Sequence, residues 1–300
     1  MAKQLSQDAV WLITGCSSGL GKSLCQIISQ TSHYRLVATA RQLSSLTYLP
    51  DSPRILKLSL DVTSPVSISN TLSKTVEQFK RIDVLINNAG YGLLGDAEAI
   101  TDTDARAQFE TNFWGPVNLT KSILPIFREV NPVGEGGTVV QITSMGGYFG
   151  FPGNAFYHAS KFALEGYTEA VAKEMFPEWG IKFLIAEPGG MKTDYAGRSM
   201  KVLEPHPAYL DPKAPTNLLR AYLATEGVDQ TWAEPAAVAK LLVDVVTEGK
   251  CPLRLPVGST SWAMIKADVE ATKKELDEWR TVSESCSGPH GLSSIDLGRK

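Results

Sequence analysis

The sequence predicts an α/β fold, a doubly wound parallel sheet of about seven strands flanked by helices on both faces. Short β-rich runs alternate with helix-compatible stretches through residue 190, which is the pattern of repeated strand–helix–strand units. The runs are apolar at consecutive positions, as in Trp11-Leu12-Ile13 and Val84-Leu85-Ile86. Such runs are typical of strands that helices cover on both sides.

The elements follow one another in a regular order. The predicted strands are Val10 to Thr14, Arg35 to Ala40, Ile55 to Leu60, Ile82 to Asn87, Thr138 to Thr143 and Ile181 to Glu187. The predicted helices between them lie near residues 20–31, 65–80, 102–130 and 155–178. Pro65 falls near the start of its helix, where its missing N–H costs little. We find no internal repeat or linker, so residues 1–300 are expected to form a single domain.

The pattern loosens after Pro188. Residues 195–230 contain Gly197 and three prolines between 205 and 212, and they predict a mobile segment that forms a lid over the substrate. A helix near 234–248, an apolar run from Cys251 to Val257 and a charged helix near 259–282 follow. Residues 283–300 are rich in Ser and Gly and are expected to form a flexible tail.

The composition excludes several classes of protein. The 300 residues contain no apolar run of about 18 or more, so no membrane span is expected, and the N-terminus lacks a signal-peptide pattern. A cytoplasmic location is therefore expected. The net charge of −3 without a basic block argues against a nucleic-acid partner. The four cysteines form no C-x-x-C pair and have no histidine cluster beside them, which predicts neither a metal site nor a disulfide framework.

A glycine-rich turn, Thr14 to Gly21, follows the first predicted strand and precedes a helix. Gly15, Gly19 and Gly21 let the backbone turn tightly and approach a ligand, while the helix start offers free N–H groups. This arrangement predicts a phosphate or pyrophosphate cradle of a Rossmann-type fold. A turn without a ligand is the structural alternative.

The same turn also matches G-x-S-x-G, the nucleophile elbow of hydrolases. Ser17 would then be the nucleophile, with His158, His206 or His290 as the base. That elbow normally follows a central strand and would leave the third glycine unexplained, so the cradle is favoured.

The second predicted strand ends in Thr39-Ala40-Arg41. A carboxylate near this position would bind the ribose 2′-hydroxyl of NAD, whereas Ala40 leaves room for a 2′-phosphate and Arg41 supplies a planar cation for it. Lys22 could assist. The pattern favours NADP(H) over NAD(H), and the alternative is that Arg41 is only a solvated surface residue.

Over about residues 8–260, the sequence resembles the short-chain dehydrogenase/reductase family in its single-domain soluble form. The matching segments are the glycine turn, Asp61-Val62, Asn87-Asn88-Ala89-Gly90, Asn112, Ser144, the YxxxK pair Tyr157 and Lys161, and Pro188-Gly189 with Thr193. One departure is Ser18, where many NADP-dependent members carry a basic residue. The NADP argument therefore depends on Arg41.

The resemblance implies a set of site residues. The implied catalytic residues are Asn112, Ser144, Tyr157 and Lys161. The implied cofactor-binding residues are Gly15, Ser17, Ser18, Gly19, Leu20, Gly21, Arg41, Asp61, Val62, Asn88, Ala89, Gly90, Tyr157, Lys161, Pro188, Gly189, Met191 and Thr193. Asn112 is expected to hold a water that relays protons from Lys161 to solvent.

Tyr157 and Lys161 share one face of a helix because they are four residues apart. Leu164, Thr168 and Val171 continue that stripe, so the pair should face the protein core. A tyrosine that works as an acid/base near neutral pH needs about 3–4 kcal/mol of phenolate stabilisation, which a nearby ammonium can provide. The pair thus predicts interconversion of a ketone or aldehyde and an alcohol, with Tyr157 as the general acid/base and Ser144 bonded to the carbonyl oxygen.

Around the pair, glycines are expected to leave open space in the pocket and aromatic residues to give apolar contact, which predicts a hydrophobic substrate. The expected pocket residues are Ser144, Gly146, Tyr148, Phe151, Tyr157, Met191 and Tyr195, and further wall candidates are Gly147, Phe149, Leu93 and Leu94. A stripe of small residues on the same helix, Ala159, Ala163, Gly166 and Ala170, suggests close packing against a second copy. The family commonly pairs this helix across a two-fold axis, which implies a homodimer or homotetramer.

Two other function classes remain open from the residues alone. One is a non-redox isomerase, dehydratase or cyclase on the same scaffold, which an intact Ser/Tyr/Lys/Asn set disfavours. The other is a binding protein that senses dinucleotides without turnover. The sequence names neither the substrate nor the physiological direction.

Overall fold

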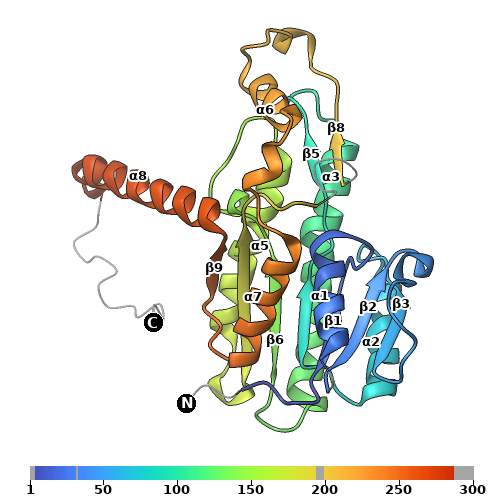
Figure 1. The fold of residues 1–300 in the computed structure, drawn as a ribbon. Coiled ribbons are helices and arrows are strands. Elements are labelled where there is room, and N and C mark those ends of the chain that lie inside the picture. The colour runs from blue at the N-terminus through green and yellow to red at the C-terminus, as the bar shows by residue number, and fades with distance from the viewer. Residues whose placement is uncertain (1–3, 32, 194–198, 287–300) are drawn as a thin grey trace.

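A seven-stranded parallel sheet forms the centre of the molecule (Figure 1). The computed structural model describes residues 4–31, 33–193 and 199–286. The strand order is β3-β2-β1-β4-β6-β7-β9, which confirms the predicted doubly wound α/β fold. The strands are β1 (Val10–Ile13), β2 (Arg35–Ala40), β3 (Ile55–Ser59), β4 (Val84–Asn87), β6 (Gly137–Ile142), β7 (Ile181–Pro188) and β9 (Arg254–Val257).

Helices cover both faces of this sheet because its strands are apolar on both faces. On β1, Trp11 and Ile13 pack into the core on one side, while Val10 and Leu12 pack into the core on the other. The first side carries α1 (Gly19–Gln30) and α7 (Pro235–Glu248), which pack on each other. The second side carries α2 (Pro65–Phe79), α4 (Gly115–Pro125) and α5 (Ala155–Glu174).

The helix predicted over 102–130 is divided. It begins as α3 (Asp102–Phe109), continues through a π-helical turn at Glu110–Trp114 into α4, and ends in a second π-helical turn at Ile126–Val130. At the junction Gly115 packs against Val62, since a Cβ there would lie 2.9 Å from a Val62 methyl. Such π-helical turns often occur at functional sites.

The helix predicted to end near 178 ends at Glu174 instead. Met175 and Phe176 are extended, and Pro177 starts a short 3₁₀ turn. Proline disfavours the helical conformation of the residue before it, which accounts for the earlier end.

The segment expected to form an irregular lid contains regular structure. Strand β8 (Met200–Val202) pairs in parallel with β5 (Gly92–Leu94), and Lys201 forms a 2.6 Å ion pair with Asp104 of α3. Helix α6 (Pro215–Ala224) follows, and no helix was predicted there. Figure 1 shows this segment above the carboxyl ends of the strands. Tyr195 and Gly197 lie outside the described residues.

Helix α8 (Ser259–Glu284) is slightly longer than predicted and extends away from the sheet (Figure 1). Of the tail predicted over 283–300, residues 287–300 lie outside the described residues. Within the described ranges, we find no helix with the length and apolarity that crossing a membrane requires.

Candidate active site

A cavity of about 1310 Å³ opens at the carboxyl ends of the strands. Its walls include the turns that follow β1, β4, β6 and β7. Strands β1 and β4 are neighbours in the sheet although β2 and β3 lie between them in the sequence, so the chain reverses direction across the sheet at this point. Ligands of open α/β sheets bind at such a switch point.

The glycine turn forms one end of this cavity. Gly15 and Gly19 have positive φ angles of 70° and 54°, a conformation that glycine adopts without strain. Gly21 lies behind the turn, where an added Cβ would overlap the carbonyl oxygen of Gly15 and lie 2.6 Å from Asn88 Nδ2. The glycines are therefore required by the close approach of the turn, α1 and the segment after β4.

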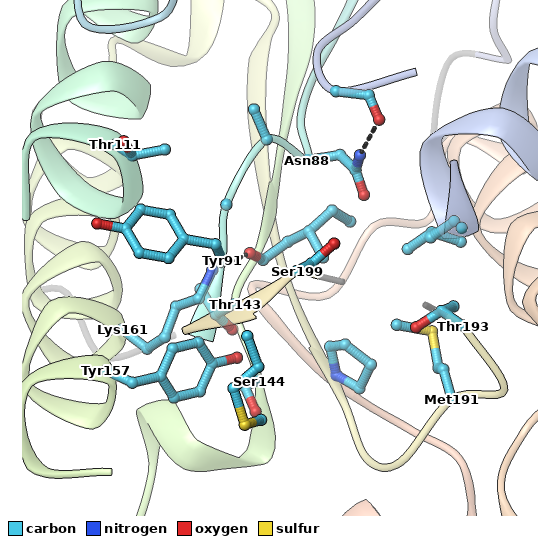
Figure 2. A pocket seen from close by; sticks show the side chains of 18 of the residues that line it. Asn88, Tyr91, Thr111, Thr143, Ser144, Tyr157, Lys161, Met191, Thr193 and Ser199 are labelled. Atoms are coloured by element: carbon cyan, nitrogen blue, oxygen red, sulfur yellow. Dashed lines mark hydrogen bonds between the residues drawn. The ribbon is translucent and has the colours of Figure 1, made fainter. Parts of the chain in front are cut away.

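Thr14 and Asn88 tie the ends of β1 and β4 together. Asn88 Nδ2 donates hydrogen bonds to the carbonyl oxygens of Thr14 (2.9 Å) and Gly15 (3.1 Å). In return, Thr14 Oγ1 accepts from the backbone N–H groups of Asn88 and Ala89, both at 2.9 Å. These bonds fix the shape of the cradle, and Figure 2 shows one of them, donated by the Asn88 side chain.

Arg41 and Asp61 line the same cavity beyond the turn. Arg41 is exposed directly after β2, and the Asp61 carboxylate accepts from Thr63 N (2.9 Å) and Thr63 Oγ1 (2.8 Å). Lys22 lies over the Tyr48 ring at 5.0 Å and faces an adjoining hollow that also contains Ser17 and Ser18. Of these two cationic side chains, Arg41 is therefore the one that lines the cavity at the end of β2.

The predicted cofactor residues fit a dinucleotide. All of them line the cavity except Gly21, which supports the turn from behind. The lining members are Gly15, Ser17, Ser18, Gly19, Leu20, Arg41, Asp61, Val62, Asn88, Ala89, Gly90, Tyr157, Lys161, Pro188, Gly189, Met191 and Thr193. No side chain fits at Gly21, as expected where the helix packs closely against the strand end behind a phosphate-binding turn.

Tyr157, Lys161 and Ser144 meet at the other end of the cavity. Figure 2 shows the hydroxyl of Tyr157 directed toward Ser144. Lys161 Nζ lies 5.8 Å from the centre of the Tyr157 ring and donates a 2.9 Å hydrogen bond to the Ile142 carbonyl at the end of β6. Burial lowers the pKa of Lys161 to about 8, and the nearby Glu165 carboxylate opposes this effect.

Asn112 lies behind this group, fully buried in the π-helical turn. Its Oδ1 accepts from the Tyr91 N–H (3.1 Å), and its Nδ2 donates to the Tyr91 carbonyl (2.9 Å). Gly90 separates it from the cavity, because a Cβ at Gly90 would lie 3.1 Å from Asn112 Oδ1 and 3.6 Å from Lys161 Nζ. Asn112 therefore holds the segment that carries Tyr91, and its proposed water stays a prediction.

The substrate residues expected from the sequence divide into two groups. Ser144, Phe151, Tyr157 and Met191 line the cavity. Gly146 and Tyr148 do not, and neither do the further candidates Gly147, Phe149, Leu93 and Leu94. The His158 ring fills the space at Gly146, and the Glu165 carboxylate fills the space at Gly147. Both glycines make room for side chains of α5. The expectation that they widen the pocket was therefore wrong.

Several lining residues were missed by the sequence analysis. They are Tyr91, Met200, Leu219, Tyr222, Leu223, Trp232 and Met264. Tyr91 directly follows the Asn-Asn-Ala-Gly segment, and that adjacency could have identified it. Trp232 packs on Gly190 after β7, where a Cβ would lie 2.8 Å from its ring. No local pattern predicts that contact.

The hydrolase alternative lacks its base among the described residues. His158 bonds the Gly146 carbonyl through Nδ1 at 2.7 Å, and burial lowers its pKa. His206 Nδ1 accepts from Ala208 N at 3.2 Å within the lid. Neither histidine hydrogen-bonds Ser17, and His290 lies outside the described residues. The described part of the chain also contains no group of His, Cys, Asp and Glu side chains that could hold a metal ion.

Comparison with known proteins agrees with this geometry. A family model described as short chain dehydrogenase matches residues 9–202. The chain is 41% identical over 299 residues to oxidoreductase calM from Penicillium decumbens, across 98% of this chain and 95% of that protein. It is 34% identical to a 3-ketodihydrosphingosine reductase from Bacteroides thetaiotaomicron, across 84% of this chain and 88% of that protein.

Solved structures share the fold. A short-chain dehydrogenase from Streptomyces avermitilis is 33% identical with a TM-score of 0.82, across 93% of this chain and 100% of that chain. Two enzymes that are each 19% identical were solved with different cofactors. The one from Burkholderia cenocepacia contains NADP (TM-score 0.69, 91% of this chain, 97% of that chain), and the one from Burkholderia phymatum contains NAD (0.70, 96% and 100%). By its sequence match and its fold, the chain belongs to the short-chain dehydrogenase family.

Proposed function

We propose that the protein is an NADP(H)-dependent oxidoreductase that interconverts a ketone or aldehyde and an alcohol on a hydrophobic substrate. One observation carries the proposal. Tyr157, Lys161 and Ser144 converge on the cavity whose other end is the glycine cradle. A proton donor and a dinucleotide site thus share one space.

The chemistry of each residue follows from its position. A nicotinamide cofactor bound in the cradle would supply the hydride. Tyr157 holds the proton at its hydroxyl and gives it to the carbonyl oxygen, and Ser144 Oγ donates a hydrogen bond to the same oxygen. Lys161 stabilises the phenolate that remains, since its ammonium is buried beside the Tyr157 ring. In the oxidative direction Tyr157 accepts the proton instead.

Arg41 is the basis for preferring NADP(H). It lines the cavity directly after Ala40, where an NAD site would place a carboxylate. A guanidinium can bind a 2′-phosphate through two parallel hydrogen bonds. Arg41 would hold that phosphate at the end of the cavity remote from Tyr157.

The lid supports a large hydrophobic substrate. Leu219, Tyr222 and Leu223 of α6 line the cavity with Trp232 and Met264. Such a wall binds apolar surface, and a few polar groups then fix the orientation of the ligand. The relative named as a 3-ketodihydrosphingosine reductase is consistent with a hydrophobic ketone as substrate.

Helix α5 supports self-association. Ala159, Gly166 and Ala170 are exposed on it, and a Cβ at Gly166 would meet no atom within 4 Å. We expect this face to pack against a second copy, giving a homodimer or homotetramer. Light scattering at micromolar concentration would test this, and a monomer would contradict it.

A cofactor-consumption screen tests the function. Purified protein is mixed with NADPH and a panel of aliphatic, aromatic, steroid-like and polyketide-like ketones, with NADH as the control. We expect NADPH oxidation matched one to one by alcohol formation with at least one apolar ketone. NADPH binding without consumption would favour a dinucleotide sensor. Product formed without net oxidation would favour a non-redox enzyme.

A further inference from the structure

Helix α5 contacts the segment that carries Ser144 at three places. Lys161 bonds the Ile142 carbonyl, His158 bonds the Gly146 carbonyl, and the Glu165 carboxylate lies against Gly147. The first two contacts come from side chains that line the cavity, whereas Glu165 lies behind it. Glu165 is one helical turn beyond Lys161, and only 3% of its surface is exposed.

Glu165 belongs to a buried charged cluster. Glu187, at the end of β7, is 1% exposed, and Arg254 of β9 reaches both carboxylates. The Arg254 Nε atom lies 3.4 Å from Glu165 Oε2 and 3.7 Å from Glu187 Oε1. Its terminal nitrogen also pairs with Glu169 at 2.8 Å. One guanidinium thus faces three carboxyl groups, two of them buried.

A single cation cannot neutralise this cluster, so one buried carboxyl must hold a proton. Glu165 Oε1 and Glu187 Oε1 both lack a hydrogen-bond donor among the described residues. A proton on the Glu187 carboxyl that is donated to the Glu165 carboxylate would give both oxygen atoms a hydrogen-bond partner. Burial raises the pKa of both carboxyls, and the charge of Glu165 adds to this rise for Glu187, whose pKa reaches about 8. Arg254 Nε donates a hydrogen bond to Glu165 Oε2 and lies beyond hydrogen-bond distance of Glu187, so we assign the negative charge to Glu165 and the proton to Glu187.

We propose that Glu165 is a positioning residue of the active site, whose carboxylate, held by Arg254 and a protonated Glu187, keeps the Lys161 ammonium charged in the cavity wall. The expected effect on turnover depends on the function proposed above, whereas the expected effect on the charge of Lys161 does not. A buried ammonium loses its proton easily unless an anion is near. Glu165 supplies that anion without entering the cavity.

The other groups around Lys161 do not supply this charge. Tyr157 on the same helix is its partner in catalysis, β6 offers the Ile142 carbonyl, and Asn112 from the π-helical turn is neutral. Glu187 and Arg254 come from β7 and β9 and act on Glu165. Burial and the Glu165 charge are the causes that set the pKa of Lys161.

The direct test measures the pKa of the Lys161 amine in the absence of substrate and cofactor. The rate of its acetylation by acetic anhydride is followed against pH by peptide mass spectrometry, because only the neutral amine reacts. In Glu165→Gln, the pH at which the Lys161 acetylation rate is half-maximal (the Lys161 midpoint) should fall by about one unit. An unchanged midpoint in the folded variant would overturn the proposal.

Glu169→Gln is the matched control. Glu169 is one further turn along α5 and pairs with the same Arg254, but its side chain is 34% exposed. Its removal should leave the Lys161 midpoint unchanged. A shift as large as that of Glu165→Gln would show that any charge on α5 acts equally, which contradicts a specific role for Glu165.

Two further variants test the proton assigned to Glu187 and the role of Arg254. Glu187→Gln replaces a protonated carboxyl with an amide of similar shape, so the Lys161 midpoint should not move, and a fall of one unit would contradict the assigned proton. If Glu165→Gln does not fold, Arg254→Gln replaces it. Without Arg254, Glu165 should take up a proton, and the Lys161 midpoint should fall. No shift there would overturn the proposal.

The pH profile of turnover adds the catalytic readout. Reduction should fail at high pH when Lys161 loses its charge. The alkaline limb of kcat/KM should therefore move to lower pH by about one unit in Glu165→Gln and stay in place in Glu169→Gln. Complete absence of turnover in the unaltered enzyme would contradict the proposed function and leave the labelling result standing. An unmoved limb in an active Glu165→Gln variant would contradict the positioning role.

Discussion

The two ends of the cavity are built in different ways. At the cradle, short sequence motifs are joined by hydrogen bonds to backbone groups, as when the Asn88 side chain bonds the carbonyl oxygens of Thr14 and Gly15. At the lid end, the wall consists of side chains from distant segments, such as Leu219 of α6 in the lid together with Trp232 and Met264, which follow the lid in the sequence. The cradle is therefore defined by backbone shape, whereas the lid is defined by side-chain packing. We expect substitutions to be tolerated poorly at the cradle and well at the lid.

Tyr157 lies at the end of the cavity opposite the cradle, and its removal should have the largest effect. In Tyr157→Phe, turnover should fall by about 10²- to 10⁴-fold because the proton donor is lost. Dinucleotide binding, followed by NADPH fluorescence, should change little because the ring remains. Substantial residual turnover would remove Tyr157 from its assigned role.

Gly21→Ala should disrupt the cradle. The added Cβ would overlap the Gly15 carbonyl oxygen, and such overpacking destabilises the fold by about 1–3 kcal/mol. Because relief of the overlap must displace the turn, the binding of NADPH and NADH should weaken alike, by roughly 100-fold. Gly150→Ala makes the same chemical change where a Cβ meets no atom within 4 Å, and it should bind normally. Equal affinities of the two variants by calorimetry would argue that the turn does not hold the dinucleotide.

Arg41→Ala should act on one cofactor only. Loss of a charge-assisted hydrogen bond to the 2′-phosphate should raise the Kd for NADPH by about tenfold. The Kd for NADH should stay the same, since its ribose carries no phosphate. A parallel loss for both cofactors, or a clear preference of the unaltered enzyme for NADH, would refute the assignment of Arg41.

Tyr222→Ala should have the smallest effect. Tyr222 lines the cavity from α6 but is 51% exposed, so its loss removes only part of a wall. The KM for a bulky apolar ketone should rise about fivefold, while NADPH affinity and kcat for a small ketone are preserved. A fall in NADPH affinity would show that the lid and the cradle are not separable.

The same contrast explains what the sequence could reveal. The sheet, the cradle and the Tyr157–Lys161 pair were predictable, because apolar runs, glycine spacing and helical period are local signals. Trp232 on Gly190 and the pairing of Met200 with Gly92 were not, because they join segments far apart in the chain. Gly146 was interpreted as open space when it accommodates the His158 ring.

The buried charged cluster could not be predicted from the sequence either. Glu165 appears in the sequence as an ordinary polar residue of a helix, and Glu187 as the end of a strand. Only the packing of β9 beside β7 brings Arg254 to both of them. The π-helical turn at Glu110–Trp114 was not predicted either, and it ends where Gly115 packs against Val62, a residue far from it in the sequence.

The central claim is that a dinucleotide hydride and the Tyr157 proton meet on one carbonyl in this cavity. NADPH deuterated at the transferring position of its nicotinamide ring tests it most directly, with an apolar ketone that the enzyme reduces. Mass spectrometry of the alcohol should find one deuterium on the carbinol carbon for each NADPH oxidised. An alcohol formed without deuterium would contradict the account.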